Sequence, residues 1–391
     1  MYPNLYYAFK DLFGVEWPFL RFINSFGFFV AIAFIVAALV LTAELRRKSK
    51  QGLFQPTEMQ VMVGQPATAS DLILNFLLGF IMGYKILALF ILDDAATEDP
   101  QAFIFSTLGS WPAGIGMGLL FAGIKWWEKN KQKLSKPEKR TVRIWPHDRV
   151  GELTIIALVF GLAGAKLFDI FENWSDFLQR PADYIFSAKG LTFYGGLICA
   201  ALAIWWYAKK HKIGFWHLND AMAPTMMLAY GVGRIGCQVS GDGDWGIVNT
   251  RPNPFSWLPD WAWSYTYPHN VNEVGVPIPG CTGKFCMELP EAVYPTPLYE
   301  VVFCLALFGL LLLLRKKMRI PGTLFAIYLM MNGLERFLIE KIRVNTRMNI
   351  FGFQPTQAEV ISSLLFLSGL VLFLWLRKNQ SGKAVSAAGR S

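Results

Sequence analysis

The stretch Tyr230-Gly-Val-Gly-Arg-Ile-Gly-Cys-Gln-Val-Ser-Gly-Asp-Gly-Asp-Trp-Gly246 is the most informative part of this 391-residue chain. An apolar segment ends here and continues into a loop rich in glycine and aspartate. Arg234 stands among three glycines at a depth where a membrane helix is still inside or at the edge of the bilayer. An arginine there costs about 2.5 kcal/mol or more unless an anion or a water-filled cavity receives it. The stretch therefore predicts a polar site for an anionic group, with a phospholipid headgroup as the obvious candidate.

The composition also indicates a membrane protein. Hydrophobic residues make up 53% of the chain and charged residues only 17%, whereas soluble domains are usually about a quarter charged. The net charge of +9 is concentrated in short basic runs beside apolar segments, a pattern typical of cytoplasmic loops. We expect no nucleic-acid partner, because each run abuts a hydrophobic helix and none forms an aromatic and basic face. The basic runs lie at 46–50, 129–143, 209–212, 315–317 and 377–378.

Apolar stretches long enough to cross the hydrocarbon core predict an all-α polytopic protein of about nine transmembrane helices. An outward N-terminus and an inward C-terminus place every basic run in the cytoplasm. The acidic segment 93–99 and the long loop 238–293 then lie outside, and we expect the loop to form a small periplasmic head. No cleavable signal peptide is expected in the first 20 residues. The predicted spans lie near 24–45, 71–92, 104–126, 152–172, 192–209, 217–237, 297–315, 322–340 and 357–376.

The chain also contains a weak internal sequence repeat, called the echo below. Residues near 61–85 recur near 142–166, each copy ending in Gly-x-Lys (Gly83-Tyr84-Lys85 and Gly164-Ala165-Lys166). Either the N-terminal part holds a duplicated transmembrane hairpin, or two apolar helices match by chance. We predict three parts: 1–150 with the duplicated hairpin, a core at 151–376, and a disordered cytoplasmic tail at 377–391. Lys166 either snorkels to an interface or belongs to the polar site.

Other polar elements fall on the outer side of the same predicted helices. Paired glycines after Tyr194 open the fifth span and leave backbone N–H groups free for an anion. Glu300 lies in the first turns of the seventh span, after two prolines. Arg336 and Glu340, four residues apart on the eighth span, share a helix face and can pair. Each alone could be an interfacial charge, but together they predict one site at the outer leaflet.

The cysteines indicate the compartment. Cys281 and Cys286 lie in the outer loop and could form a disulfide in an oxidising periplasm. The alternative is two free thiols. The sequence has no His/Cys cluster at metal-ligand spacing, so we expect no metal and no cofactor.

The order of these motifs resembles the phosphatidylglycerol–prolipoprotein diacylglyceryl transferases of the bacterial inner membrane. The resemblance rests on Gly190-Leu-Thr-Phe-Tyr-Gly-Gly196, on Gly233-Arg-Ile-Gly236 followed by an acidic Trp-Gly, on Pro295-Thr-Pro-Leu-Tyr-Glu300, and on Arg336-Phe-Leu-Ile-Glu-Lys-Ile-Arg343. It covers roughly residues 152–376. The family typically has seven spans in the same orientation, so the resemblance implies one extra hairpin here.

The resemblance implies transfer of a diacylglyceryl group from phosphatidylglycerol to the lipobox cysteine thiol of a prolipoprotein, releasing glycerol phosphate. Arg234 and Arg336 would clamp the leaving phosphate, because guanidinium groups bind phosphate bidentately. Glu300 or Glu340 would hold the arginines, and Tyr194 would lie beside the reacting atoms. The expected partners are phosphatidylglycerol, the lipobox peptide and membrane lipids. The expected substrate-binding residues are Arg234, Lys166, Gly195, Gly196, Gly236, Gly246, Tyr299 and Arg343.

The chain departs from the family pattern in several places. Tyr194 and Tyr294 stand where the family usually has histidine, Cys237 where it has asparagine, and Lys166 where it has arginine. Tyr194 either orients a substrate through its hydroxyl or takes a proton in a cationic pocket. Two other functions remain: a lipid transporter or flippase with intramembrane charges along its path, or an inactive transferase-like membrane scaffold.

Overall fold

The computed structural model describes residues 1–91, 103, 106–181, 185, 190, 192–345, 347–349 and 353–388, so the acidic segment 93–99 lies outside the described residues. The protein is mostly helical, as predicted. Among the described residues, five helical segments are long and apolar enough to cross a membrane: Ser25–Lys50, Ala69–Phe90, Pro146–Glu172, Thr296–Leu314 and Gln357–Asn379.

Helices of the described chain occupy every stretch for which the sequence predicts a span. The third begins later than predicted, at Trp111, because Ser110 caps it and Pro112 fits its first turn. The last continues beyond residue 376 to Ala388, so this part of the predicted disordered tail is helical; a helix already formed propagates at little cost. The helices are α2 (Ser25–Lys50), α3 (Ala69–Ile81) with the turns Met82–Ile86 and Leu87–Phe90, α5 (Trp111–Lys131), α6 (Val150–Glu172), α9 (Phe193–Lys210), α10 (Phe215–Ser240), α12 (Thr296–Leu314), α13 (Thr323–Glu340) and α14 (Gln357–Ala388).

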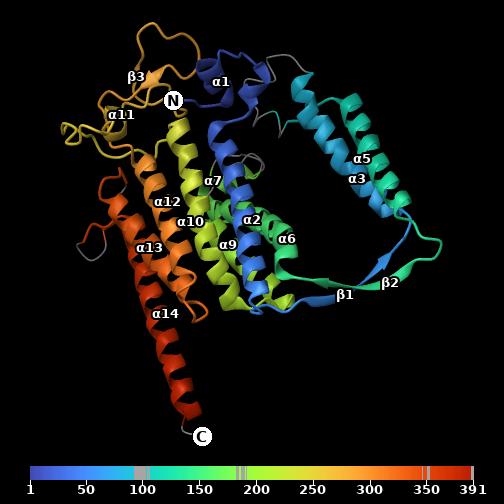
Figure 1. The fold of residues 1–391 in the computed structure, drawn as a ribbon. Helices are drawn as coiled ribbons and strands as arrows, with labels where there is room; N and C mark the ends of the chain where they lie inside the picture. The colour runs from blue at the N-terminus through green and yellow to red at the C-terminus, as the bar shows by residue number, and fades with distance from the viewer. Residues whose placement is uncertain are drawn as a thin grey trace. The chain divides into compact units, whose positions relative to one another are not determined.

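The first of two compact units comprises residues 1–16, 23–54 and 213–391. In this unit α10 packs against both α2 and α12, and α13 packs along α14 (Figure 1). Glycines of α10 allow this helix to lie close to α2 and to α12. A Cβ on Gly236 would lie 3.1 Å from the Phe29 side chain of α2, and one on Gly231 would lie 2.9 Å from Cys304 of α12. Small residues at such contacts are typical of membrane helix pairs.

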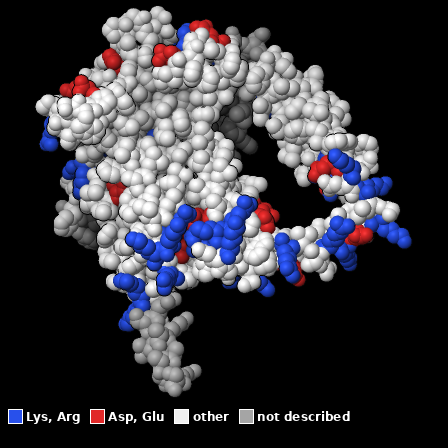
Figure 2. Space-filling model, in the orientation of Figure 1, with Lys and Arg blue, Asp and Glu red and all other residues white. Residues whose placement is uncertain are grey.

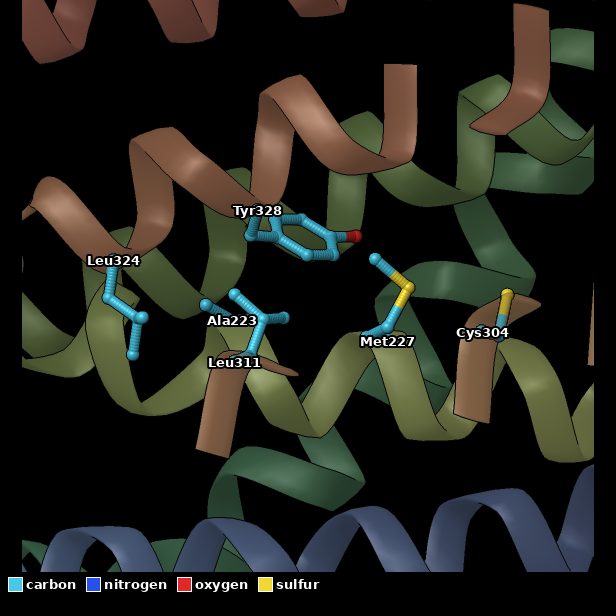
Figure 3. Close-up of a cluster of buried hydrophobic side chains, with 6 residues drawn as sticks. All are labelled: Ala223, Met227, Cys304, Leu311, Leu324 and Tyr328. Carbon is cyan, nitrogen blue, oxygen red and sulfur yellow. The ribbon is translucent and has the colours of Figure 1, made fainter. Parts of the chain in front are cut away.

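A buried apolar cluster holds α10, α12 and α13 together (Figure 3). Packing of this kind fixes the helices against one another, because protein interiors are close-packed and resist shifts. These three helices carry Arg234, Glu300 and Arg336, so the cluster positions the predicted site. Its members are Ala223 and Met227 of α10, Cys304 and Leu311 of α12, and Leu324 and Tyr328 of α13.

The loop after α10 folds into a small segment that is called the head below. It contains α11 (Asp260–Trp263) and a two-stranded antiparallel sheet of β3 (Val276–Pro277) and β4 (Met287–Glu288), and α1 (Leu5–Phe13) belongs to the same unit. Buried Tyr267 donates a hydrogen bond to Gln238 of α10 at 2.8 Å, which fastens the head to that helix. Cys281 and Cys286 form a disulfide, which decides between the two alternatives for this pair.

Lys and Arg side chains gather at the end of the first unit's helices opposite the head (Figure 2). Buried Glu44 pairs there with Arg315 and with Arg47. Asp220 accepts hydrogen bonds from the backbone N–H groups of Gly322 (2.9 Å) and Phe325 (3.1 Å). Asp220 therefore caps the start of α13, which lies against its carboxylate.

The second unit comprises residues 17–22 and 55–212. It contains α3, α5, α6, α9, the short helices Pro18–Phe22, Pro146–Arg149 and α7 (Trp174–Gln179), and an antiparallel pair of β1 (Thr57–Val63) and β2 (Glu138–Ile144). The strands begin 81 residues apart, and so do the helices α3 and α6 that follow them. Gln60 pairs with Thr141 at the centre of the strand register, and these two residues are also 81 apart.

The glycine of each Gly-x-Lys copy, Gly83 or Gly164, has the same role in helix packing. A Cβ on Gly83 would lie 2.2 Å from the carbonyl oxygen of Ala113 on α5. A Cβ on Gly164 would lie 2.4 Å from the Cβ atom of Cys199 on α9. Each glycine therefore permits its helix to approach the next one closely.

Candidate active site

Three helices and one loop of the first unit bring the predicted charges together. Arg234 and Tyr230 are four residues apart on α10, and the Arg234 guanidinium lies 5.2 Å from the centre of the Tyr230 ring. Glu300 lies near the start of α12, and Arg336 near the end of α13. The helices meet at their head-side ends, so the side chains form one cluster.

Glu300 lies at the centre of this cluster and is completely buried. Its Oε2 atom is 3.2 Å from Nε of Arg234 and 3.8 Å from Nη1 of Arg343, and its Oε1 atom is 3.6 Å from Nη1 of Arg336. Tyr230 donates a hydrogen bond to Oε1 at 2.6 Å. One carboxylate thus orients three arginines and one phenol.

A second carboxylate, Asp244, bridges Arg234 and Arg343 by direct ion pairs. The backbone brings them together, because Gly246 forms a β-bridge with Arg343. A Cβ on Gly246 would lie 2.5 Å from the carbonyl oxygen of Ile342, so only glycine fits there. Gly246 therefore has a packing role, and its predicted contact with substrate stays a prediction.

Glu340 holds Arg336 in place, as the spacing of four residues predicts. Its Oε2 atom lies 3.0 Å from Nη2 of Arg336. Its Oε1 atom accepts hydrogen bonds of 2.6 Å from Thr356 and from Asn345. The buried Glu340 carboxylate is therefore fixed from both sides and orients Arg336 toward Glu300.

Several buried polar atoms of this cluster have no hydrogen-bond partner among the described residues. They include the donors Nη1 of Arg336 and Nε and Nη1 of Arg343. Buried donors are almost always satisfied in native proteins, so these three nitrogen atoms are candidates for binding an acceptor. Arginine donors in particular match the oxygens of a phosphate group.

The head-side aspartates differ in their titration. Burial opposes ionisation of Asp244, but the guanidinium groups of Arg234 and Arg343 outweigh it and lower its pKa. Burial, together with the neighbouring Asp244, raises the pKa of Asp242. Cys237, Asp242 and Asp244 have ligand atoms within 4.8 Å of one another. We assign no metal there, because Asp244 is already shared by two arginines.

Four predicted site residues lie in the second unit. Tyr194, Gly195 and Gly196 open α9, and α6 carries Lys166. A Cβ on Gly195 would lie 2.4 Å from the Phe168 side chain, and a Cβ on Gly196 would lie 2.8 Å from the carbonyl oxygen of Gly161. Both glycines thus permit close packing of α9 on α6, and their contact with substrate stays a prediction.

The two echoed lysines bind loop carbonyls. Lys85 donates to the carbonyl oxygens of Ser106 (2.6 Å) and Leu108 (2.7 Å). Lys166 lies 3.5 Å from the carbonyl oxygen of Gly190 and 3.7 Å from Asp169. Each therefore braces the loop that follows its helix. For Lys166, the position in the helix alone predicted either snorkelling to an interface or a place in the polar site.

Two more residues have structural contacts that the sequence did not predict. The Tyr299 hydroxyl donates to the carbonyl oxygen of Trp263 at 3.3 Å, which ties the head to α12. Gly236 faces Phe26 and Phe29 of α2. Substrate contacts of Tyr299 and Gly236 stay predictions.

Sequence reasoning missed the partners that complete the cluster: Tyr230, Asp244 and Glu335. Tyr230 stands four residues before Arg234, a spacing that places both on one helix face. Asp244 lies in the quoted stretch, but its approach to Arg343 depends on the path of the loop. Glu335 is a carboxyl inside an apolar helix, which is itself a signal of function.

The fold and the cluster define a class: a multi-pass helical membrane protein with a cluster of arginines and carboxylates between its helices. The family model described as prolipoprotein diacylglyceryl transferase matches residues 119–375, and the chain belongs to this family. This confirms the resemblance seen in the sequence.

Curated relatives carry the same description, phosphatidylglycerol–prolipoprotein diacylglyceryl transferase. The Dehalococcoides mccartyi protein is 28% identical over 288 residues, covering 72% of this chain and 95% of the relative. The Corynebacterium efficiens protein is 28% identical over 238 residues, covering 60% and 70%. The Pseudomonas aeruginosa protein is 26% identical over 259 residues, covering 65% and 86%.

Proposed function

We propose that this protein transfers the diacylglyceryl group of phosphatidylglycerol to the thiol of a prolipoprotein lipobox cysteine. The products are a thioether-linked diacylglyceryl protein and glycerol phosphate. The observation that carries the proposal is the triad of partly buried Arg234, Arg336 and Arg343 around buried Glu300, in which three arginine nitrogen atoms have no hydrogen-bond partner among the described residues.

The triad suits the phosphate group of phosphatidylglycerol, which leaves as glycerol phosphate. The Glu300, Glu340 and Asp244 carboxylates balance three guanidinium charges and fix their directions. The orphaned Arg336 and Arg343 donors then bind phosphate oxygens, and the Arg234 guanidinium completes the clamp. Preorganised charge of this kind stabilises the negative charge that develops on the leaving oxygen. It also favours the thiolate of the incoming cysteine.

The membrane arrangement follows from the charge pattern. Nine helices cross the bacterial inner membrane, with the head and arginine triad at the periplasmic leaflet and the basic end of the first unit in the cytoplasm. Buried Glu44 and Arg315 pair at that basic end, far along α2 and α12 from the head. The head disulfide fits an oxidising periplasm.

The domain organisation completes the proposal. A duplicated hairpin (β1–α3–α5 beside β2–α6–α9) lies at the junction of the parts 1–150 and 151–376. The equal 81-residue offsets of strands and helices support the duplication. A transporter built from inverted halves has less support, because the two copies are short, adjacent and similar in direction along the chain.

Purified protein mixed with phosphatidylglycerol and a lipobox peptide tests the proposal. We expect a thioether-linked peptide and an equal amount of glycerol phosphate. A peptide with serine in place of the cysteine is the matched control and should give neither product. Intact protein that makes no thioether under these conditions would instead support the inactive scaffold.

A further inference from the structure

A fourth carboxyl group in the arginine cluster has no role in the clamp. Glu335 lies on α13 directly before Arg336, and only 6% of its surface is exposed. Both of its carboxyl oxygens are buried and have no hydrogen-bond partner in the described part of the chain. By contrast, Glu300, Glu340 and Asp244 each have an arginine partner. Of these four carboxyl groups, Glu335 is therefore the one with no ion-pair or hydrogen-bond partner among the described residues.

The helix geometry directs Glu335 into the cluster. It follows Tyr328 by seven residues, two helical turns, so the two side chains share one face of α13. Tyr328 packs in the buried junction with α10 and α12 (Figure 3). Charged and titratable groups of every helix at that junction interact with Glu335: Tyr230 and Arg234 of α10, Glu300 and Cys304 of α12, Tyr328 and Arg336 of α13, and Arg343 beyond it.

The transfer needs a proton acceptor. The thiol must lose its proton as sulfur attacks carbon, because the thiolate is the nucleophile. The residue at the family's usual histidine position is Tyr194, and an ordinary tyrosine, with a pKa near 10, is a poor acceptor at neutral pH. A carboxylate within the site is the remaining kind of base in the described cluster.

We propose that Glu335 accepts the proton of the lipobox thiol, an inference that rests on the proposed transfer reaction. The carbon–oxygen bond to the phosphate breaks as the carbon–sulfur bond forms. Its electron pair leaves with glycerol phosphate, which the arginines hold. The thiol proton moves to the Glu335 carboxylate and returns to solvent before the next cycle.

Glu335→Gln tests this role, because it keeps the side-chain shape and removes only the ability to take a proton. Transfer rates and the affinity for phosphatidylglycerol are measured from pH 6 to 9.5, with Glu335→Asp as a second variant. Glu291→Gln, which alters an exposed carboxyl of the head, is the matched control. We expect the Gln variant to lose about 100-fold in rate at neutral pH with lipid affinity unchanged.

The pH dependence separates proton transfer from a structural role. The deficit of Glu335→Gln should shrink toward and above the thiol's own pKa of about 8.5, where solvent removes the proton. Glu335→Asp should recover part of the rate, and Glu291→Gln should behave as wild type. A Gln variant with wild-type rates, or with the same deficit at every pH, overturns the inference. A wild-type protein without product instead contradicts the transfer reaction, and this inference with it.

Discussion

The Nε atom of Arg234 lies 3.2 Å from Oε2 of Glu300, and this contact joins α10 to α12 inside the cluster. Glu300 also faces Arg336 and Arg343, so one buried carboxylate controls the direction of three guanidinium groups. Breaking such a network at one carboxylate costs more than any single contact contributes, because it leaves buried charges unpaired.

Glu300→Gln should therefore damage both stability and function. The amide keeps the shape and the acceptor for Tyr230, but it removes the charge that balances the arginines. We expect a loss of about 3–5 kcal/mol in the free energy of unfolding, by analogy with other broken buried pairs. Thermal unfolding in detergent measures it. Glu288→Gln in the head is the control, and equal melting temperatures for the two variants would contradict the central role of Glu300.

Asp242→Asn should stabilise the head at neutral pH. The pKa of Asp242 is raised, so Asp242 costs stability in full above its folded pKa, and this cost declines below that pKa and disappears below the unfolded pKa. The melting temperature should rise by about 2 °C at pH 7, with a smaller gain in acid.

Asp244→Asn is the comparison variant, for which we expect the opposite change in stability. The pKa of Asp244 is lowered, so its contribution to stability is present above its unfolded pKa and is lost as the pH falls through the folded pKa. This variant should be less stable than wild type at pH 7. A neutral-pH gain from both variants would contradict the assigned ion pairs.

Tyr194→Phe should lose part of the transfer activity, by about 1–2 kcal/mol for one buried hydrogen bond. The pH–rate profile should keep its shape, because Tyr194 orients a substrate and is not the base. Loss of most of the rate together with the basic limb of the profile would instead make tyrosinate the base. An unchanged rate would show that Tyr194 is only packed at this position.

Reporter fusions test the membrane arrangement. Fusions after Lys129 or Lys212 should be cytoplasmic, and fusions after Asp99 or Asn270 should be periplasmic, because basic runs remain on the cytoplasmic side. A reporter on the wrong side at any of these positions contradicts the count of nine spans.

Much of the helical fold was predictable because apolar runs of this length have few other structures available. Arg234, Glu300, Arg336 and Glu340 were predictable as a group for a related reason: charges inside apolar helices are costly unless they meet. Their mutual contacts, including the Arg336–Glu340 pair, agree with that reasoning.

Contacts between distant segments were not predictable. Asp244 reaches Arg343 only because the loop returns to pair Gly246 with Arg343, and no local pattern encodes that return. Asp220 accepts from Gly322, the N-cap of α13, which lies 102 residues later in the chain. The packing of α6 against Gly195 and Gly196 was likewise not predictable, while their contact with substrate stays a prediction. In each case the missing information was which segment packs alongside.

The transfer rate of Arg234→Lys, measured beside Arg234→Ala, tests the central claim most directly. Lysine keeps the positive charge but cannot contact Glu300, Asp244 and a phosphate with one planar fork. We predict that Arg234→Ala abolishes transfer and that Arg234→Lys restores little of it, while Arg251→Lys in the head retains the wild-type rate. Full activity in Arg234→Lys would contradict bidentate binding of the lipid phosphate.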